Sequence, residues 1–359
     1  MRTLAIAVLL LAPQAQSDVI VIKGGRFLTV ANGDLEDAVI VIENGKIAKI
    51  GKEVAIPTGA KVIELPKGAC VAPGFIDAHS YLASAFEVEE GTESVTPEVK
   101  AIEAFTSDHP DVRAALSSGV TMVAIAPGNG NLIGGRVGVL RLNGRRYDQM
   151  IVKDVAATKL SLSNEALRFD REPTSRQGAM TLLRRLLKEK PIDGIVFLHA
   201  SAADDIQRAL DLAASFKLRA VLVHADEAGE TVDAIKAAKI PVAFGPIFAS
   251  DKREKLEAPA KLAKAGISIA FVSDAPATSE SQLRLAAAIA MKHGLERDAA
   301  LRALTMVPAA MLGLSDRVGS LEAGKDADLV IYSGDPLSLT SDVETVIVEG
   351  RISFQKPKK

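Results

Sequence analysis

Cysteine is almost absent from this chain of 359 residues, since Cys70 is the only one. A single thiol excludes an internal disulfide, and we expect Cys70 to serve as a small buried hydrophobic residue. An excess of either charge is also absent, because 43 basic and 45 acidic residues give a net charge of −2. This balance excludes the strongly basic surface that nucleic acid binding needs, so we expect no nucleic acid partner.

Long apolar runs are missing as well. The run from Leu4 to Leu11 is well short of the roughly 20 residues that span a bilayer. Met1-Arg2 precedes it and Ala15-Gln16-Ser17 follow, a pattern typical of a secretory signal. We expect residues 1–17 to be a signal peptide and the mature protein to be secreted or periplasmic, free of the membrane. A buried first strand or a membrane anchor is the alternative interpretation.

Short strand patterns fill both ends of the remaining chain. They lie at 19–23, 25–30, 38–43, 46–50, 327–332 and 343–351. Asn44-Gly45 and Glu349-Gly350 supply turns between strands. We therefore expect one β-sandwich domain, built from residues 18–70 and 325–359.

Residues 71–324 alternate apolar strands with amphipathic helices, which predicts an α/β domain with parallel strands. The expected strands lie at 70–78, 119–126, 138–142, 156–162, 194–199, 220–224, 241–245 and 267–273. Helical stripes at 205–217 and 282–291 should cover the outside. Eight strands predict a barrel of the TIM type. The join between the second and third strands has room for no helix, although a parallel connection requires a crossover.

Imidazole, amine and carboxylate groups lie at the ends of several expected strands. They are His79, Lys159, His199, His224 and Asp274. In such a barrel the carboxyl ends of the strands surround one cup, and imidazole and carboxylate suit Zn²⁺. A strand-end histidine can also be a hydrogen-bonded structural residue, and the aspartate can be a turn former. Three of the five histidines at such positions favour a metal site.

Several segments together resemble one known family. They are Pro73-Gly74-Phe75-Ile76-Asp77-Ala78-His79, the loop from Pro127 to Gly135, His199-Ala200, Ser273-Asp274-Ala275-Pro276 and the passage from Val318 to Val330. The chain resembles the imidazolonepropionase-like branch of the amidohydrolase superfamily over nearly all of the expected mature sequence. The resemblance implies a (β/α)₈ barrel beside a composite β-sandwich, and hydrolysis of a C–N bond in a small amide, cyclic amide or peptide.

The resemblance also implies roles for individual residues. His79, His199, His224 and Asp274 would hold zinc or another divalent ion, one ion rather than two, and Asp274 would also transfer the proton. Lys159 is the candidate for the carboxylated lysine that bridges two ions in many members. The glycine-rich loop could bind a substrate carboxylate through backbone N–H groups, or be a plain tight turn. Its candidate residues are Asn129, Asn131, Gly134 and Gly135.

Tyr81 departs from the family pattern, in which the first strand ends in His-x-His. Residues i and i+2 of a strand share a face, so two such histidines can bind one ion together and the loss of one weakens metal binding. A neutral phenol binds metal poorly. Two functions stay open. The protein is either an exported metal-dependent amidohydrolase or an inactive protein of the same fold that binds a ligand or a partner subunit. It could form a homo-oligomer or pair with an intact relative. A periplasmic solute-binding protein would leave the strand-end histidines unexplained. The acidic segment 87–93 could face substrate, partner or solvent.

Overall fold

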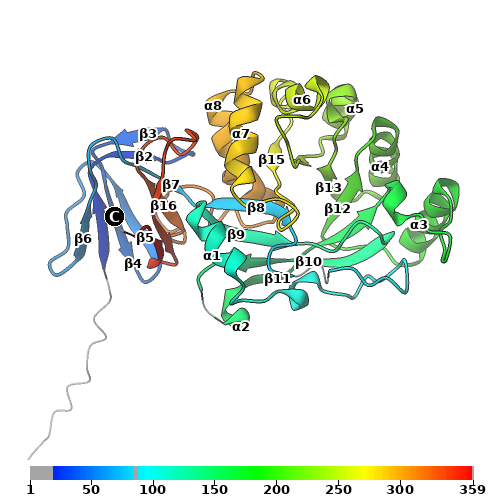
Figure 1. The fold of residues 1–359 in the computed structure, drawn as a ribbon, viewed down its shortest axis with the longest axis horizontal. Helices are drawn as coiled ribbons and strands as arrows, with labels where there is room; N and C mark the ends of the chain where they lie inside the picture. Colours follow the sequence, from blue (N-terminus) through cyan, green and yellow to red (C-terminus); the bar gives the residue numbers. More distant parts are fainter. Residues whose placement is uncertain (1–18, 85–87, 145, 358–359) are drawn as a thin grey trace, which may run out of the picture.

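The computed structural model describes residues 19–84, 88–144 and 146–357. The expected signal peptide and Glu87 lie outside these residues. The molecule has two parts side by side, a β-sandwich at the left of Figure 1 and a barrel to its right. In the part of the chain that the structure describes, no helix has the length and apolar character needed to cross a membrane.

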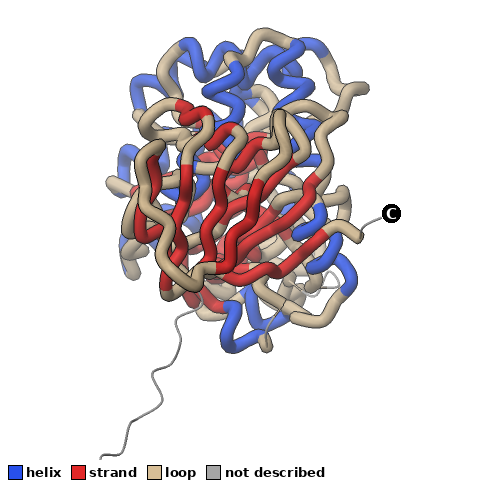
Figure 2. Tube along the Cα trace, turned by 90° about the vertical axis from the view of Figure 1, so that its left-hand side faces the viewer, coloured by secondary structure: helices blue, strands red, loops and turns tan. Residues whose placement is uncertain are grey.

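Within the described residues, the sandwich contains ten strands from both ends of the chain. They are β1 (Ile20–Lys23), β2 (Arg26–Leu28), β3 (Asp34–Glu36), β4 (Val39–Glu43), β5 (Lys46–Gly51), β6 (Lys61–Glu64), β7 (Cys70–Pro73), β16 (Leu329–Tyr332), β17 (Val343–Val348) and β18 (Arg351–Gln355). One sheet has the order β5-β4-β1-β6 and the other β18-β17-β16-β7-β2-β3. Figure 2 shows these strands side by side, and the antiparallel pairing of β16 with β7 confirms the predicted composite of both chain ends.

Both predicted turns of the sandwich are present. Asn44 (φ 52°) and Gly45 (φ 76°) join β4 to β5, while Glu349 (φ 48°) and Gly350 (φ 70°) join β17 to β18. Two successive residues with positive φ match the right-handed twist of a hairpin, which explains the glycine in each pair. Cys70 is buried, as expected.

The barrel contains the eight predicted strands. They are β8 (Phe75–Ser80), β9 (Val120–Ile125), β10 (Ile133–Arg141), β11 (Ile151–Ser161), β12 (Ile195–Ala200), β13 (Arg219–His224), β14 (Val242–Phe244) and β15 (Ile269–Phe271). They are hydrogen-bonded in this order, and β15 returns to contact β8, so the barrel is nearly closed.

The direction of β10 differs from the expectation. It pairs antiparallel with β9, with Gly138 opposite Ile125, and antiparallel with β11, with Arg136 opposite Thr158. The prediction of a parallel connection between the second and third strands was therefore wrong. An antiparallel neighbour needs only a short turn, which is why no helix fits between them.

The first predicted strand is divided at Gly74 between the two parts of the molecule. Cys70–Pro73 belong to the sandwich and Phe75–Ser80 to the barrel. A Cβ atom at Gly74 would lie 2.1 Å from Oγ1 of Thr121, so only glycine lets the chain pass this close to β9.

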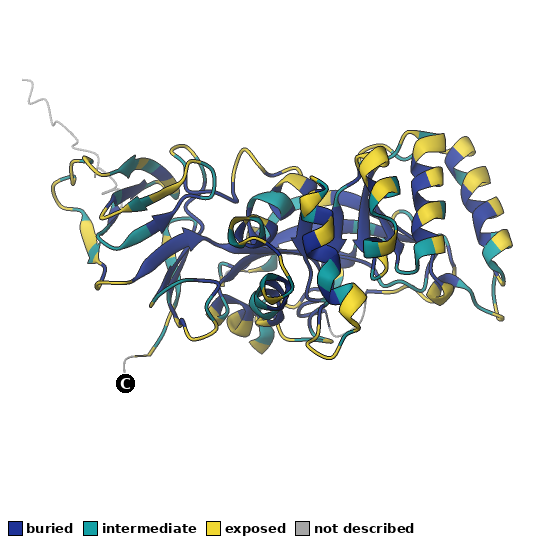
Figure 3. Ribbon diagram, turned by 90° about the horizontal axis from the view of Figure 1, so that it is seen from above, coloured by how far each residue is buried: buried dark blue, intermediate teal, exposed yellow. Residues whose placement is uncertain are grey.

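Helices cover the outer side of the barrel (Figures 1 and 3). They are α1 (Pro110–Ser117), α2 (Tyr147–Met150), α3 (Arg176–Glu189), α4 (Ala203–Phe216), α5 (Val232–Ala238), α6 (Arg253–Lys264), α7 (Gln282–Lys292), α8 (Arg297–Leu304) and α9 (Met306–Met311), with 3-10 turns η1 (Ala101–Ala104), η2 (Asn164–Ala166) and η3 (Ala228–Glu230). Ile206, Leu210 and Ala213 of α4 are buried on the predicted stripe, and Figure 3 shows helices with a buried inner and an exposed outer side.

One arginine of the barrel is bound by the returning chain of the sandwich. The Arg141 guanidinium is 3% exposed and donates to Asp328 at 2.9 Å, to Asp326 at 2.7 Å and to Glu349 at 2.7 Å. Three carboxylates around a buried cation compensate for its loss of hydration. This contact fixes β10 to the segment that enters the sandwich.

Candidate metal centre

Three side chains meet at the carboxyl ends of barrel strands. His79 lies in β8, His224 ends β13 and Asp274 follows β15. Asp274 contacts both rings, with Oδ1 lying 2.8 Å from His79 Nδ1 and Oδ2 lying 2.8 Å from His224 Nε2. Among the described residues, the atoms of these three groups that could bind an ion all lie within 4.8 Å of one another. The structure thus brings together three of the predicted ligands.

His199 extends this group on the side of His224. Its Nδ1 lies 2.7 Å from Nδ1 of His224, and its Nε2 lies 3.5 Å from Oε1 of Glu165. Glu165 belongs to η2, directly beyond the carboxyl end of β11, and the sequence analysis missed it. Extending the search for acidic residues by one turn past each strand end would have found it.

Lys159 closes the group on the side of His79. Its Nζ lies 2.7 Å from Nε2 of His79 and donates to the carbonyl oxygen of Pro127 at 2.7 Å and to the Tyr81 hydroxyl at 3.3 Å. The amine is fully buried and points into the cup, not to solvent. Tyr81, at the position of the missing imidazole, therefore binds the amine of Lys159.

A buried carboxyl pair lies beneath the ligands. Asp77 accepts hydrogen bonds from the backbone N–H groups of His79, at 3.2 Å, and of Ser273, at 3.3 Å. Burial raises the pKa of Asp77 to about 7. Glu280 is also buried, accepts from Ser80 at 3.2 Å and has its pKa raised well above the usual range, first by burial and then by Asp77. These contacts hold the ends of β8 and β15 together.

Two ligand residues have unusual backbone conformations. His224 has φ 68° and Asp274 has φ 55°, in the left-handed region that few residues other than glycine adopt. Strain of this kind persists only where the surroundings enforce it, and it concentrates at functional sites. Here the strained backbone directs both side chains toward each other.

The electrostatics favour neutral imidazoles beside an ionised carboxylate. Burial lowers the pKa of His79 to about 3 and that of His199 to about 4. Burial opposes ionisation of Asp274, but His224 and His79 more than offset it and hold its pKa well below the usual range. Burial also lowers the pKa of Lys159 to about 7. Neutral imidazole and ionised carboxylate are the forms that bind a metal ion.

The donor atoms fit a divalent ion. Nε2 of His224 lies 2.8 Å from Oδ2 of Asp274, and Nε2 of His199 lies 3.5 Å from Oε1 of Glu165, so each buried nitrogen faces a carboxylate oxygen. Neutral imidazole nitrogen and carboxylate oxygen are groups that hold zinc in proteins, so the chemistry of these residues fits a divalent ion.

The residues of the predicted carboxylate-binding loop separate into two groups. Asn129 hydrogen-bonds to Glu165, and Asn131 donates to the carbonyl oxygen of Glu90 at 2.7 Å. Gly134 and Gly135 lie in β10, where a Cβ would come within 3.0 Å of Pro127 and 2.3 Å of Val99 O. Close packing accounts for these two glycines, and their substrate-binding role stays a prediction.

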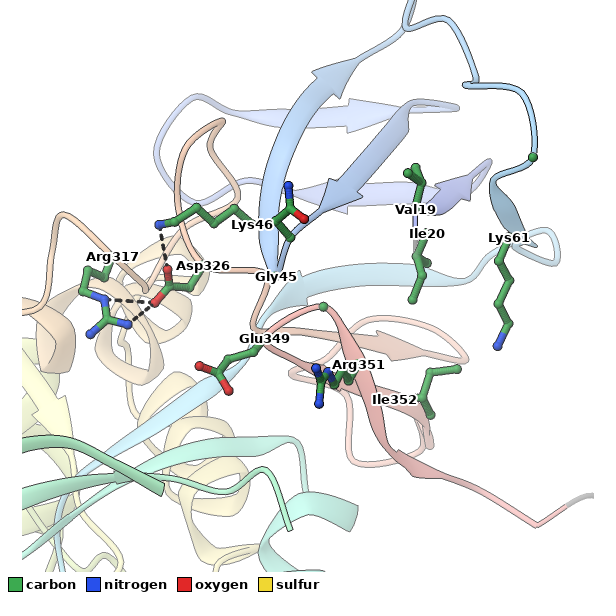
Figure 4. Close-up of a pocket in the computed structure, with 13 residues that line it drawn as sticks. Val19, Ile20, Gly45, Lys46, Lys61, Arg317, Asp326, Glu349, Arg351 and Ile352 are labelled. Carbon is green, nitrogen blue, oxygen red and sulfur yellow. Dashed lines mark hydrogen bonds and ion pairs between the residues drawn. The ribbon is translucent and has the colours of Figure 1, made fainter. Parts of the chain in front are cut away.

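A pocket of about 860 Å³ lies elsewhere in the molecule (Figure 4). Lys46, Arg317 and Asp326 line one side of it, and Lys61 and Arg351 line another. Residues of the sandwich and of the segment leading into it form this pocket, and none of the metal-centre residues lines it.

The fold and the centre together define a class of barrel proteins with imidazole and carboxylate groups gathered at the strand ends. A sequence model described as "Amidohydrolase family" matches residues 199–354. The crystal structure of an amidohydrolase from Thermotoga maritima MSB8 superposes with a TM-score of 0.85 at 30% identity, covering 94% of this chain and all of the other.

Two curated relatives add to this likeness. The imidazolonepropionase of Mesorhizobium japonicum is 26% identical over 86% of this chain and 91% of its own length. The amidohydrolase tasK of Hapsidospora irregularis is 24% identical over 89% of this chain, but the match spans only 40% of tasK. The chain belongs to the amidohydrolase family.

Proposed function

We propose that this protein is an exported hydrolase that cleaves a C–N bond in a small amide, cyclic amide or peptide. A single divalent ion, with zinc as the first candidate, would be held by His79, His224 and Asp274, with His199 beside them. The observation that carries the proposal is the convergence of these ligand atoms within 4.8 Å of one another.

The residues of the centre can carry the remaining chemistry. A bound zinc ion would lower the pKa of its water toward about 7 and polarise the amide carbonyl. Asp274, ionised between two imidazoles, is placed to accept a proton from that water and return it to the leaving nitrogen. Burial holds the pKa of Tyr81 well above its usual range, so its phenol keeps a proton that it can donate to a substrate oxygen.

Two observations bear on the number of ions. Lys159 contacts Nε2 of His79, and Nδ1 of the same ring faces Asp274, so one side of the cup is already filled by an amine. This supports one ion rather than two, and the role of Lys159 as a carboxylated bridge stays a prediction.

The same contacts favour a second candidate function. Both ring nitrogens of His79 contact other side chains of the protein, Asp274 and Lys159. His79 therefore has its polar contacts without a metal ion. An inactive binding protein of the same fold, acting alone, as a homo-oligomer or with an intact relative, fits this observation.

Metal content separates the two functions. Protein purified without chelator should contain about one equivalent of zinc or a similar ion by mass spectrometry, and His224→Ala should lose it. His293→Ala is the matched control, because His293 ends α7 outside the centre. Tyr81→His should bind the ion at least about tenfold more tightly in a chelator competition, since it adds an imidazole ligand.

Activity is tested on the same preparations. Release of amine from a panel of N-acyl amino acids, cyclic amides and dipeptides should disappear in Asp274→Asn. Wild-type protein that holds no ion and hydrolyses none of these compounds, even with added zinc, would favour the inactive binding protein. The proposed export is tested separately by locating the mature N-terminus in cell fractions.

A further inference from the structure

The glycine-rich loop at the edge of the metal centre holds a carboxylate of the protein itself. The N–H of Gly130 donates to Oε2 of Glu89 at 2.9 Å. A Cβ added at Gly128 would lie 2.0 Å from Oε2 of Glu89, and one at Gly130 would lie 1.9 Å from Oε1. Both positions must therefore be glycine for a carboxylate to approach the backbone this closely. The loop has the geometry of a backbone cradle for an anion.

A guanidinium group supports the same loop. Nη2 of Arg171 donates to the carbonyl oxygen of Gly130 and to Oδ1 of Asn131, both at 2.7 Å. Nε and Nη1 of Arg171 are buried and have no hydrogen-bond partner. Two unused donors on a cation beside the cradle add to its attraction for an anion.

The cradle adjoins the metal centre. Pro127, the residue before Gly128, accepts the hydrogen bond from Lys159, and Asn129 hydrogen-bonds to Glu165 beside His199. The cradle and the metal centre are therefore connected through Pro127 and Asn129, which lie in the same loop.

We propose, on the basis of the hydrolase function above, that this loop is the binding subsite for a carboxylate of the substrate, and that Glu89 occupies it as an internal competitor. The preferred substrate is then an amide that carries a free carboxylate. Such a substrate displaces Glu89 from Gly130 when it binds.

The exchange requires only rotation of one side chain. The backbone on either side of Glu89 is fixed to the same loop, because Val88 O accepts from the N–H of Gly128 at 3.1 Å and Glu90 O accepts from Asn131 at 2.7 Å. Glu89 itself is exposed, so its carboxylate can turn into water while its neighbours stay in place.

The test is a binding measurement that needs no turnover. Butyrate and the neutral, size-matched butan-1-ol are titrated into the protein and followed by ligand-observed NMR. Glu89→Gln should bind butyrate on the order of tenfold more tightly than wild type. In wild type the Glu89 carboxylate occupies the subsite most of the time, so the apparent affinity for butyrate is reduced to the fraction of molecules in which the subsite is free. Butan-1-ol should gain nothing. Glu93→Gln, an exposed acid of the same segment, is the matched control and should bind butyrate as wild type does.

Butyrate could also bind the proposed ion instead of the loop, and a second variant distinguishes these two sites. In the Glu89→Gln background, Gly130→Ala should remove the gained affinity, because its Cβ fills the cradle. Unchanged butyrate binding in Glu89→Gln, or a gain that survives Gly130→Ala, would overturn the proposal. Metal content and amide hydrolysis of the same preparations report on the hydrolase function independently, so tightened butyrate binding without ion or turnover would reject that function alone.

Discussion

At the scale of single residues, strand-end position identified most of the centre. His79, His199, His224 and Asp274 all come together, because parallel strands of a barrel end at one cup. Glu165 was not found, because it lies in a turn beyond β11, past the strand ends from which the candidate residues were taken. The contact between Lys159 and His79 was also beyond the sequence, because the direction of a lysine side chain depends on which face of β11 turns inward.

The buried imidazoles should make the metal-free protein sensitive to acid. His199 binds its proton near pH 4 in the folded protein but near pH 6.5 in the unfolded chain. Between these values the unfolded chain holds more protons, so acidification lowers the free energy of unfolding. Asp77, with its pKa raised to about 7, acts in the opposite direction.

A difference between variants isolates the imidazole. The free energy of unfolding falls between pH 7 and pH 4 in wild type, and in His199→Asn this fall should be smaller by about 1–3 kcal/mol. The measurement is urea unfolding with a chelator present. His293→Asn should follow the wild-type curve. Equal acid sensitivity of His199→Asn and wild type would show that His199 is not held neutral by burial.

At the scale of elements, hydrophobic patterning located every barrel strand but not the direction of each. The pattern of β10 fits a parallel strand equally well, because an apolar run does not record its direction. The missing helix between β9 and β10 was the available signal, since a parallel neighbour cannot be reached without a crossover. The division of the first strand at Gly74 had a signal as well, because the pair Pro73-Gly74 commonly interrupts a strand, but residues 70–78 were predicted as one strand.

Gly74 should tolerate no side chain. Gly74→Ala places a Cβ 2.1 Å from Oγ1 and 2.3 Å from Cγ2 of Thr121. Overpacking of this kind should lower the free energy of unfolding by roughly 2–3 kcal/mol. Gly51→Ala is the control, because its Cβ would meet only a side-chain carbon of Val54 at 3.5 Å. Similar urea midpoints for the two variants would contradict the close approach of β8 and β9.

At the scale of the whole molecule, the sequence predicted both the barrel and the sandwich built from two chain ends. It did not reveal what joins them. Arg141 lies far in the sequence from its three carboxylate partners, and no local pattern links such distant segments.

Removing the central cation of this junction should be costly. Arg141→Met leaves the buried carboxylate of Asp328 without its partner, which should cost roughly 3–5 kcal/mol of stability in urea unfolding. Arg146→Met removes an exposed ion pair with Asp148 and should change stability by less than about 0.5 kcal/mol. Adding Asp328→Asn to Arg141→Met should restore part of the loss. If Arg141→Met is as stable as Arg146→Met, the junction does not bind the two parts together.

The pairing of β7 with β16 also determines the order in which the edges of the sandwich can be paired during synthesis. A ribosome releases β7 at residue 73, but the strand that covers its edge begins only at residue 329. One edge of β7 therefore has no partner strand until β16 is made, a state prone to wrong pairing. Any truncation before β16 should leave that edge permanently open and yield insoluble protein.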